Sequence, residues 1–180
     1  MNSKTNSTDI SLTSLLEIDF INQQRKNAWF LSLEETIALW KENTIFDPRS
    51  TLIGTWVKIG IWNIFYPNTT IILFEWSELV IGNSNIFMNW SYLEASHGWK
   101  LHIWSNNHFE WGVALKANML TAHIQVWDNG RYINQILQVL GQTKLGNGSQ
   151  VIGAITVQNC NLDNGGDFQE QDPDKRWWLL

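Results

Sequence analysis

The sequence has little cysteine, little positive charge and no long apolar run. Cys160 is its single cysteine, which excludes an internal disulfide and a thiolate metal cluster. Lys and Arg number 12 against 17 Asp and Glu, and the formal net charge of −5 leaves no basic field to collect nucleic-acid phosphates. No apolar run approaches the ~20 residues of a membrane span. Because the polar N-terminus also lacks the apolar core of a secretion signal, we expect a cytoplasmic protein with no membrane span and no nucleic-acid partner.

Tryptophan, by contrast, is abundant, with 12 residues in a chain of 180. An indole ring offers a large rigid apolar surface and one N–H donor, so tryptophans serve packed cores, ligand cavities and sugar platforms alike. With 44% apolar residues, a chain of this length builds one domain with a real core, and is too short for two comfortable ones. We therefore expect one domain in which most tryptophans pack internally or against another subunit.

Two N-terminal segments have helical patterns. Apolar residues at three- and four-residue intervals predict a first helix over residues 11–25. Ser32 and Glu35 have the spacing of a capping box, which predicts the start of a second helix that ends near Asn43. Two amphipathic helices ahead of a sheet are expected to cover one face or one end of it.

From residue 54 onward the apolar period changes to two, which is typical of β-strands. Apolar and polar residues alternate from Leu120 to Trp127, and the Asn129-Gly130 pair that follows fits a type I′ turn. Similar turn residues recur about every dozen positions, so short loops should join antiparallel neighbours. The expected strands are 54–66, 70–81, 86–93, 99–104, 108–115, 119–127, 131–139 and 150–158, with a helix as the alternative over 131–140.

Eight strands without intervening helices favour an antiparallel up-and-down β-barrel, because closure removes exposed edges. A barrel of this size holds side chains or one small ligand. Gly54-Thr55-Trp56, at the start of the first strand and after a helical lead, resembles the Gly-x-Trp start of the lipocalin and wider calycin group. The resemblance implies a cup for a lipophilic or aromatic molecule, with Trp56 packing across its closed end. The expected organisation is a disordered stretch over 1–10, a helical segment over 11–53, the barrel over 54–158, and a flexible acidic tail over 159–180 that ends in the apolar Trp177-Trp178-Leu179-Leu180.

The first two expected strands are apolar on both faces. In the first, Ile59 and Phe65 lie on one face, and Trp62 and Ile64 on the other. A barrel wall in contact with water should carry polar residues on its outer face, so these strands need a cover. The N-terminal helices or a second copy of the chain would provide it, and we favour a homodimer.

Polar side chains between tryptophans provide the candidate binding site. With a period of two, His102 and Trp104 share one face, as do His123 and Trp127 on another strand. Pointing inward, these faces would bind and orient an apolar molecule; pointing outward, they would be solvated. The more apolar opposite faces slightly favour the outward arrangement. The candidate ligand-binding residues are Trp62, Trp76, Trp104, Thr121, Gln125 and Trp127.

Carboxylates within apolar runs suggest general acid/base chemistry. Glu75 and Glu110 lie in such runs, where burial raises the pKa of a carboxyl group. Either residue would then exchange a proton with His102 or His123 near neutral pH. The histidine spacing fits no metal site, and neither a nucleophile motif nor a phosphate-binding loop is present. An enzyme of this sequence is therefore expected to be a cofactor-free cyclase, isomerase or lyase with these four catalytic candidates.

Three functions remain open. The leading hypothesis is a protein that binds an apolar, ring-containing small molecule in a Trp-lined barrel cavity, as a carrier or as such an enzyme. The second is a carbohydrate-binding module, and the third is an assembly protein with Trp-rich subunit interfaces. A closed cavity favours the first hypothesis and an open row of tryptophans on one surface favours the second. The candidate sugar-binding residues are Trp90, Trp99, Trp104, Asn106 and Asn107.

Overall fold

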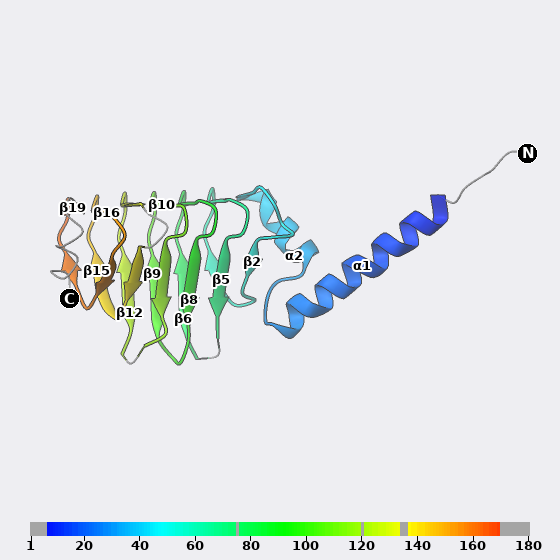
Figure 1. Ribbon diagram of the computed structural model, residues 1–180, viewed down its shortest axis with the longest axis horizontal. Coiled ribbons are helices and arrows are strands. Elements are labelled where there is room, and N and C mark those ends of the chain that lie inside the picture. Colours follow the sequence, from blue (N-terminus) through cyan, green and yellow to red (C-terminus); the bar gives the residue numbers. More distant parts are fainter. Residues whose placement is uncertain (1–6, 75, 120, 134–136, 170–180) are drawn as a thin grey trace, which may run out of the picture.

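The chain forms a parallel β-solenoid in which each coil contributes one strand to each of three sheets (Figure 1). The computed structural model describes residues 7–74, 76–119, 121–133 and 137–169, with side chains for residues 16–167. The first sheet has the order β1 (Thr44–Ile45), β4 (Ile64–Phe65), β7 (Ile86–Phe87), β10 (His108–Glu110), β13 (Arg131–Ile133), β16 (Gln150–Ile152) and β19 (Asp167–Gln169).

The other two sheets complete the wall. The second sheet has the order β2 (Leu52–Ile53), β5 (Thr70–Leu73), β8 (Tyr92–Ala95), β11 (Ala114–Ala117), β14 (Gln138–Leu140) and β17 (Thr156–Gln158). The third has the order β3 (Lys58–Ile59), β6 (Glu78–Ile81), β9 (Lys100–Ile103), β12 (His123–Val126), β15 (Gln142–Leu145) and β18 (Asn161–Leu162).

The interior is filled by ladders of like side chains, one from each coil. In the first sheet, Phe65 stacks on Phe87 with ring centroids 5.2 Å apart, and Phe87 stacks on Phe109 at 5.0 Å. Tyr132 continues the stack at 5.1 Å from Phe109. These four side chains are fully buried, and stacked aromatic pairs contribute roughly 0.5–1.5 kcal/mol each beyond their buried area.

Polar ladders hold the corner between the third and first sheets. Asn63 Oδ1 accepts hydrogen bonds from the backbone N–H and side-chain amide of Asn85. Asn85 Oδ1 accepts the backbone N–H of Asn107, whose own Oδ1 accepts that of Gly130. Because a buried amide is costly unless it is bonded, this ladder fixes the register between coils.

The N-terminal cap combines α1 (Ser7–Asn27), α2 (Leu33–Ala38) and the 3-10 helix η1 (Leu39–Lys41). The predicted capping box is confirmed, since Ser32 Oγ accepts from the Glu35 N–H and the Glu35 carboxylate accepts from the Ser32 N–H. Helix α2 lies at the β1–β2 end of the solenoid and α1 points away from it (Figure 1). Among the described helices, none combines the length and the apolar character that crossing a bilayer requires.

Buried Arg25 joins this cap to the first coil. Its guanidinium donates to the carbonyl oxygens of Leu31, Pro48 and Thr51, and to Thr36 Oγ1. Burial lowers the pKa of this group, although nearby Glu34 opposes that effect. The end of α1 is thereby fixed to the start of the solenoid.

The predicted antiparallel barrel is wrong, and with it the lipocalin and calycin assignment. All paired strands of the three sheets run parallel, and a period of two is common to parallel and antiparallel strands. The expected strand 54–66 contains β3 and β4, which belong to different sheets, with Trp62 between them at a φ of 62°. This corner changes the phase of the alternation, which is why both faces of the segment seemed apolar.

The Asn129-Gly130 turn is also different from the prediction. Only Asn129 has a positive φ, 62°, whereas a type I′ turn requires two. The turn carries the chain from β12 in the third sheet to β13 in the first, so it is a solenoid corner. The sheets also extend past the expected limits of the β domain, because β1 and β2 precede residue 54 and β18 and β19 follow residue 158. The first six residues and the apolar C-terminal end lie outside the described residues.

Candidate ligand-binding groove

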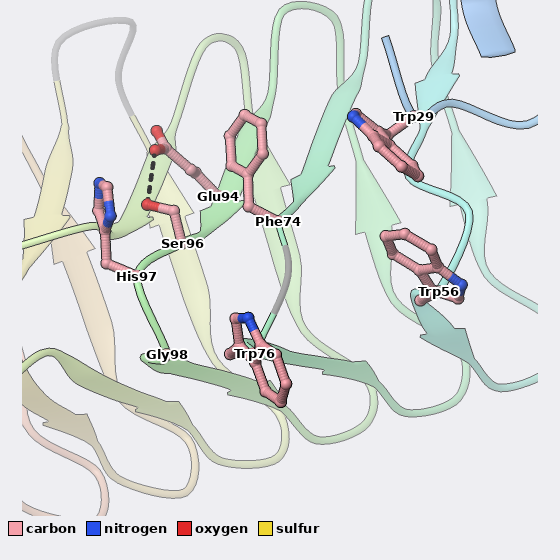
Figure 2. A pocket seen from close by; sticks show the side chains of 8 residues that line it. All are labelled: Trp29, Trp56, Phe74, Trp76, Glu94, Ser96, His97 and Gly98. Atoms are coloured by element: carbon pink, nitrogen blue, oxygen red, sulfur yellow. Dashed lines mark hydrogen bonds between the residues drawn. The ribbon is translucent and has the colours of Figure 1, made fainter. Parts of the chain in front are cut away.

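An open groove of about 830 Å³ lies at the capped end of the solenoid, beside the corner between the second and third sheets (Figure 2). Aromatic side chains form most of its wall, and a carboxylate, a hydroxyl and an imidazole contribute the polar groups. An adjoining hollow of about 380 Å³ shares Trp56, Phe74 and Trp76 with it. The groove is lined by Trp29, Trp56, Phe74, Trp76, Glu94, Ser96, His97 and Gly98.

Trp29 is placed by the C-terminal end of α1. The Phe30 N–H donates to Arg25 O and the Trp29 N–H to Lys26 O, which is the hydrogen-bond pattern of a Schellman motif. Trp29 takes the left-handed position of this motif, with a φ of 63°. The position usually holds glycine, and another residue costs roughly 1–2 kcal/mol there. Thr55 holds the strained residue by donating its N–H and Oγ1 to Trp29 O.

Trp56, Trp76 and His97 occupy the same corner in three successive coils, between β2 and β3, β5 and β6, and β8 and β9. The Trp56 ring centroid lies 5.2 Å from that of Trp29, with the planes inclined by 35°. Trp76 is also left-handed, with a φ of 65°, and leaves 91% of its surface exposed. A strained backbone that presents an indole ring to water is typical of a functional position.

Glu94 contributes a carboxylate to the groove. Its carboxylate accepts hydrogen bonds from Tyr92 Oη at 2.9 Å, Ser96 Oγ at 3.1 Å and Asn118 Nδ2 at 3.1 Å. Partial burial and the adjacent carboxylate together raise the pKa of Tyr92 to about 12. Lys116 lies opposite Glu94 in the neighbouring strand, but its Nζ lies over the Tyr92 ring, 5.5 Å from the centroid.

Several predicted site residues come together on a different surface, the outer face of the third sheet. The rings of Trp104 and Trp127 stack at 4.7 Å, and those of His102 and His123 meet edge to face at 5.5 Å. This is the outward arrangement, because Leu101, Ile103, Ile124 and Val126 fill the interior. Gln125 lies opposite His102 in the register of the two strands.

Charged groups surround the two histidines. His102 Nε2 lies 3.3 Å from a carboxylate oxygen of Glu78, and Lys100 Nζ lies 3.8 Å from the same oxygen. Burial, followed by His102 and Lys100, lowers the pKa of His123, while Glu78 raises it. Beside His123 is a hollow of about 390 Å³, to which Gln125 and Lys144 also contribute.

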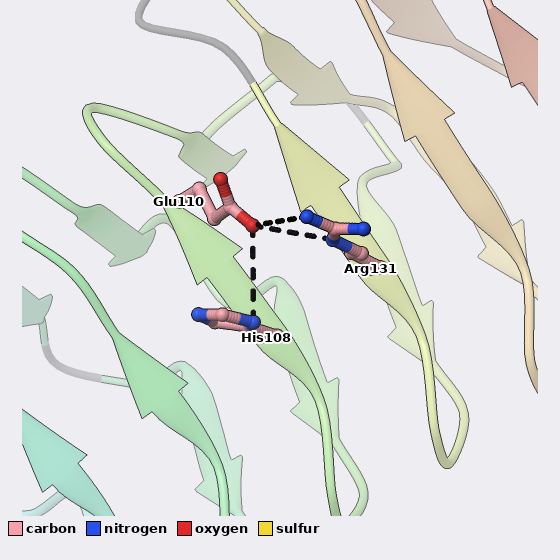
Figure 3. A network of polar contacts seen from close by, with 3 residues as sticks. All are labelled: His108, Glu110 and Arg131. Atoms are coloured by element: carbon pink, nitrogen blue, oxygen red, sulfur yellow. Dashed lines mark hydrogen bonds and ion pairs between the residues drawn. The ribbon is translucent and has the colours of Figure 1, made fainter.

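Glu110, one of the two predicted acids, lies away from these histidines. Glu110 lies on β10 of the first sheet, where Arg131 Nη2 lies 3.0 Å and His108 Nδ1 3.9 Å from its carboxylate (Figure 3). Glu75 lies outside the described residues. Of the remaining ligand-binding candidates, Trp62 is an exposed corner residue, and Thr121 lies at the same corner as Trp76, two coils further on.

The residues predicted for sugar binding are dispersed. Trp90 and Asn106 lie at corners, both with positive φ, and Trp90 is 66% exposed. Trp99 packs partly against the core. Asn107 is buried in the polar ladder, where its amide bonds the backbone of Ser105 and Gly130.

Sequence reasoning identified only Trp56 and Trp76 among the groove residues as notable. A long-range repeat was the signal that could have found the others. Phe65, Phe87, Phe109 and Tyr132 recur at intervals of 22, 22 and 23 residues, and such a period indicates a solenoid. Aligning the coils on it places Trp56, Trp76 and His97 at one corner.

Metal and thiol chemistry have no clear location in the described part of the chain. Across residues 7–169 outside the gaps, no three His, Cys, Asp or Glu side chains are grouped so as to hold a metal ion. Cys160 is partly buried, and burial raises the pKa of its thiol, which disfavours a reactive thiolate.

The chain matches no known protein-family model, and no curated protein is significantly similar to it.

Proposed function

We propose that this protein binds a carbohydrate in the aromatic groove. The observation that carries the proposal is the open cluster of Trp29, Trp56, Phe74 and Trp76, whose side chains are 45–91% exposed although each is costly to leave in water. Flat aromatic faces suit the apolar C–H faces of sugar rings. Polar groups beside them suit the hydroxyls.

The polar groups of the groove support this ligand class. Glu94 is an acceptor for sugar hydroxyls, and Ser96 and His97 lie next to it on the same wall (Figure 2). The volume of about 830 Å³ falls within the range of small-molecule sites. An apolar ring-containing ligand would use the same aromatic faces, but it would leave the carboxylate without a new partner, so the sugar is favoured.

The test is a calorimetric titration of the full chain with a panel of soluble oligosaccharides and, separately, with apolar polycyclic compounds. We expect saturable binding of a sugar, and about tenfold weaker binding in Trp56→Ala and Trp76→Ala, since a stacked ring contributes roughly 1–3 kcal/mol.

Trp90→Ala is the matched control, because Trp90 is an exposed corner residue with a φ of 67° but does not line the groove. It should bind like the unmodified protein. Binding of only the apolar compounds, or an equal loss in all three variants, would refute sugar binding in this groove.

A further inference from the structure

The charge of Glu94 bears on which sugars the groove accepts. Its three hydrogen-bond donors, Tyr92, Ser96 and Asn118, are neutral groups. Within the part of the chain that the structure describes, no Lys, Arg or His nitrogen lies within 4.0 Å of this carboxylate. The donors therefore hold and orient the Glu94 carboxylate at the wall of the groove.

The aromatic side chains add to this negative potential. The face of an indole or phenyl ring carries partial negative charge and attracts cations, most strongly for tryptophan. Trp29, Trp56 and Trp76 line the same groove as Glu94, together with Phe74. Rings and a carboxylate around one space form a favourable environment for an ammonium group.

The lysine opposite Glu94 is not paired with its carboxylate. Lys116 lies opposite Glu94 in the register, but its ammonium lies above the Tyr92 ring at 5.5 Å. Among the described lining residues, His97 is the other ionisable side chain. A ligand cation in the groove therefore has the Glu94 carboxylate available as a partner.

Building on the proposed function, we infer that the groove selects a carbohydrate with free amino groups, an oligomer of amino sugars whose ammonium group lies between Glu94 and the tryptophan rings. The sugar ring stacks on the aromatic side chains, as the ring of a neutral sugar would. The contacts of the ammonium group make the amino sugar bind more tightly than its neutral analogue.

The experiment compares calorimetric titrations of the full chain with oligomers of glucosamine and of N-acetylglucosamine, which have the same length, and with tetramethylammonium. The conditions keep the free amines protonated. We expect the glucosamine oligomer to bind about tenfold more tightly than the acetylated one, which corresponds to one cation–π contact of moderate strength. This preference should decrease as salt is added, because the groove is open to solvent.

Two variants test the source of the preference in opposite directions. Glu94→Gln keeps the size of the side chain but removes its charge, and should reduce the preference to the part that the aromatic rings alone provide. Lys116→Met removes the nearby positive charge and should increase the preference. Circular dichroism and the unfolding midpoint show whether each variant is folded.

The outcomes separate this inference from the proposed function. Equal binding of both oligomers by the unmodified protein would overturn the selection for amines and leave sugar binding intact. Binding of tetramethylammonium but of neither oligomer would overturn the amino-sugar inference and retain only a cation site. Absence of binding by all three probes would overturn the amino-sugar inference. If no sugar of the wider panel bound either, the proposed function would also be refuted.

Discussion

Asn85 donates two hydrogen bonds to a single atom, Asn63 Oδ1: one from its backbone N–H at 2.9 Å and one from its side-chain Nδ2 at 3.1 Å. Asn63 makes the same pair of bonds to Asn43 Oδ1. The amide group both donates and accepts within this ladder. A carboxylate at the same position has no donor when it is ionised.

Asn85→Asp should therefore make stability depend on pH. The buried carboxylate would face Asn63 Oδ1 and Trp104 O, both acceptors, so its pKa in the folded state would be raised. When a carboxyl group has a higher pKa in the folded state than in the unfolded state, the protein loses stability as pH rises through the unfolded pKa of about 3.9. We expect the free energy of unfolding, measured with urea, to fall by roughly 2–3 kcal/mol at neutral pH and by less at about pH 3.

Asn83→Asp is the control for that measurement. Asn83 is exposed, and its side-chain oxygen accepts the Ile61 N–H, a role that a carboxylate retains. The Asn83→Asp variant should have the same free energy of unfolding as the unmodified protein at both pH values. A similar pH response in both variants would contradict the donor role of Asn85.

Tyr132 should make the protein sensitive to alkali. Its hydroxyl is buried 2.9 Å from Ser149 Oγ, and burial raises its pKa despite that hydrogen bond. Because the tyrosine pKa is higher in the folded state, the protein loses stability as pH rises above the unfolded pKa of about 10. Tyr132→Phe should cost roughly 1 kcal/mol at neutral pH, but lose less stability on going to about pH 11. Equal alkaline losses in both proteins would show that Tyr132 is not responsible, and Tyr92 would be the next residue to test.

His123 should titrate at lower pH than an ordinary histidine. Burial and the neighbouring His102 and Lys100 oppose its protonation. Nuclear magnetic resonance titration of its ring protons should give a pKa below about 6.5, and a depressed pKa means that stability is lost as pH falls below that value. Lys100→Met should raise this pKa, whereas Lys144→Met, which removes the lysine above Trp127, should raise it less.

Removing Arg25 should weaken the N-terminal cap. In Arg25→Met, the carbonyl oxygens of Leu31, Pro48 and Thr51 lose their charged donor. We expect a loss of about 3 kcal/mol in the free energy of unfolding, together with weaker ligand binding because Trp29 lies two residues beyond the end of α1. The control, Arg49→Met, alters an exposed arginine and should change stability by less than about 0.5 kcal/mol. Equal losses would contradict the role assigned to Arg25.

Local chemistry made some elements predictable. Ser32 and Glu35 form their capping box from residues three positions apart, so a short window of sequence contains the whole interaction. The alternation from Leu120 to Trp127 likewise predicted a strand where β12 lies, although it left open which face points inward; Ile124 and Val126 are the buried residues. Strand direction was not predictable in this way, because it depends on partners a full coil away.

The groove was less predictable for the same reason. Trp29, Trp56 and Phe74 are far apart in sequence, and they meet only because the cap and two coils are stacked. Glu94 was not among the predicted acids, and one of its three donors, Asn118, comes from the next coil. Trp76 was assigned to a strand because a pattern of period two gives no information on its left-handed backbone conformation.

The described lining residues of the groove come from positions 29–98, whereas the coils continue to residue 169. In a solenoid each coil contacts mainly its neighbours. Whole coils beyond β12 can thus be gained or lost by duplication or deletion in evolution without rebuilding the groove. Within residues 29–98, the same events would separate the residues that form it, so the two parts of the chain are under different constraints on length.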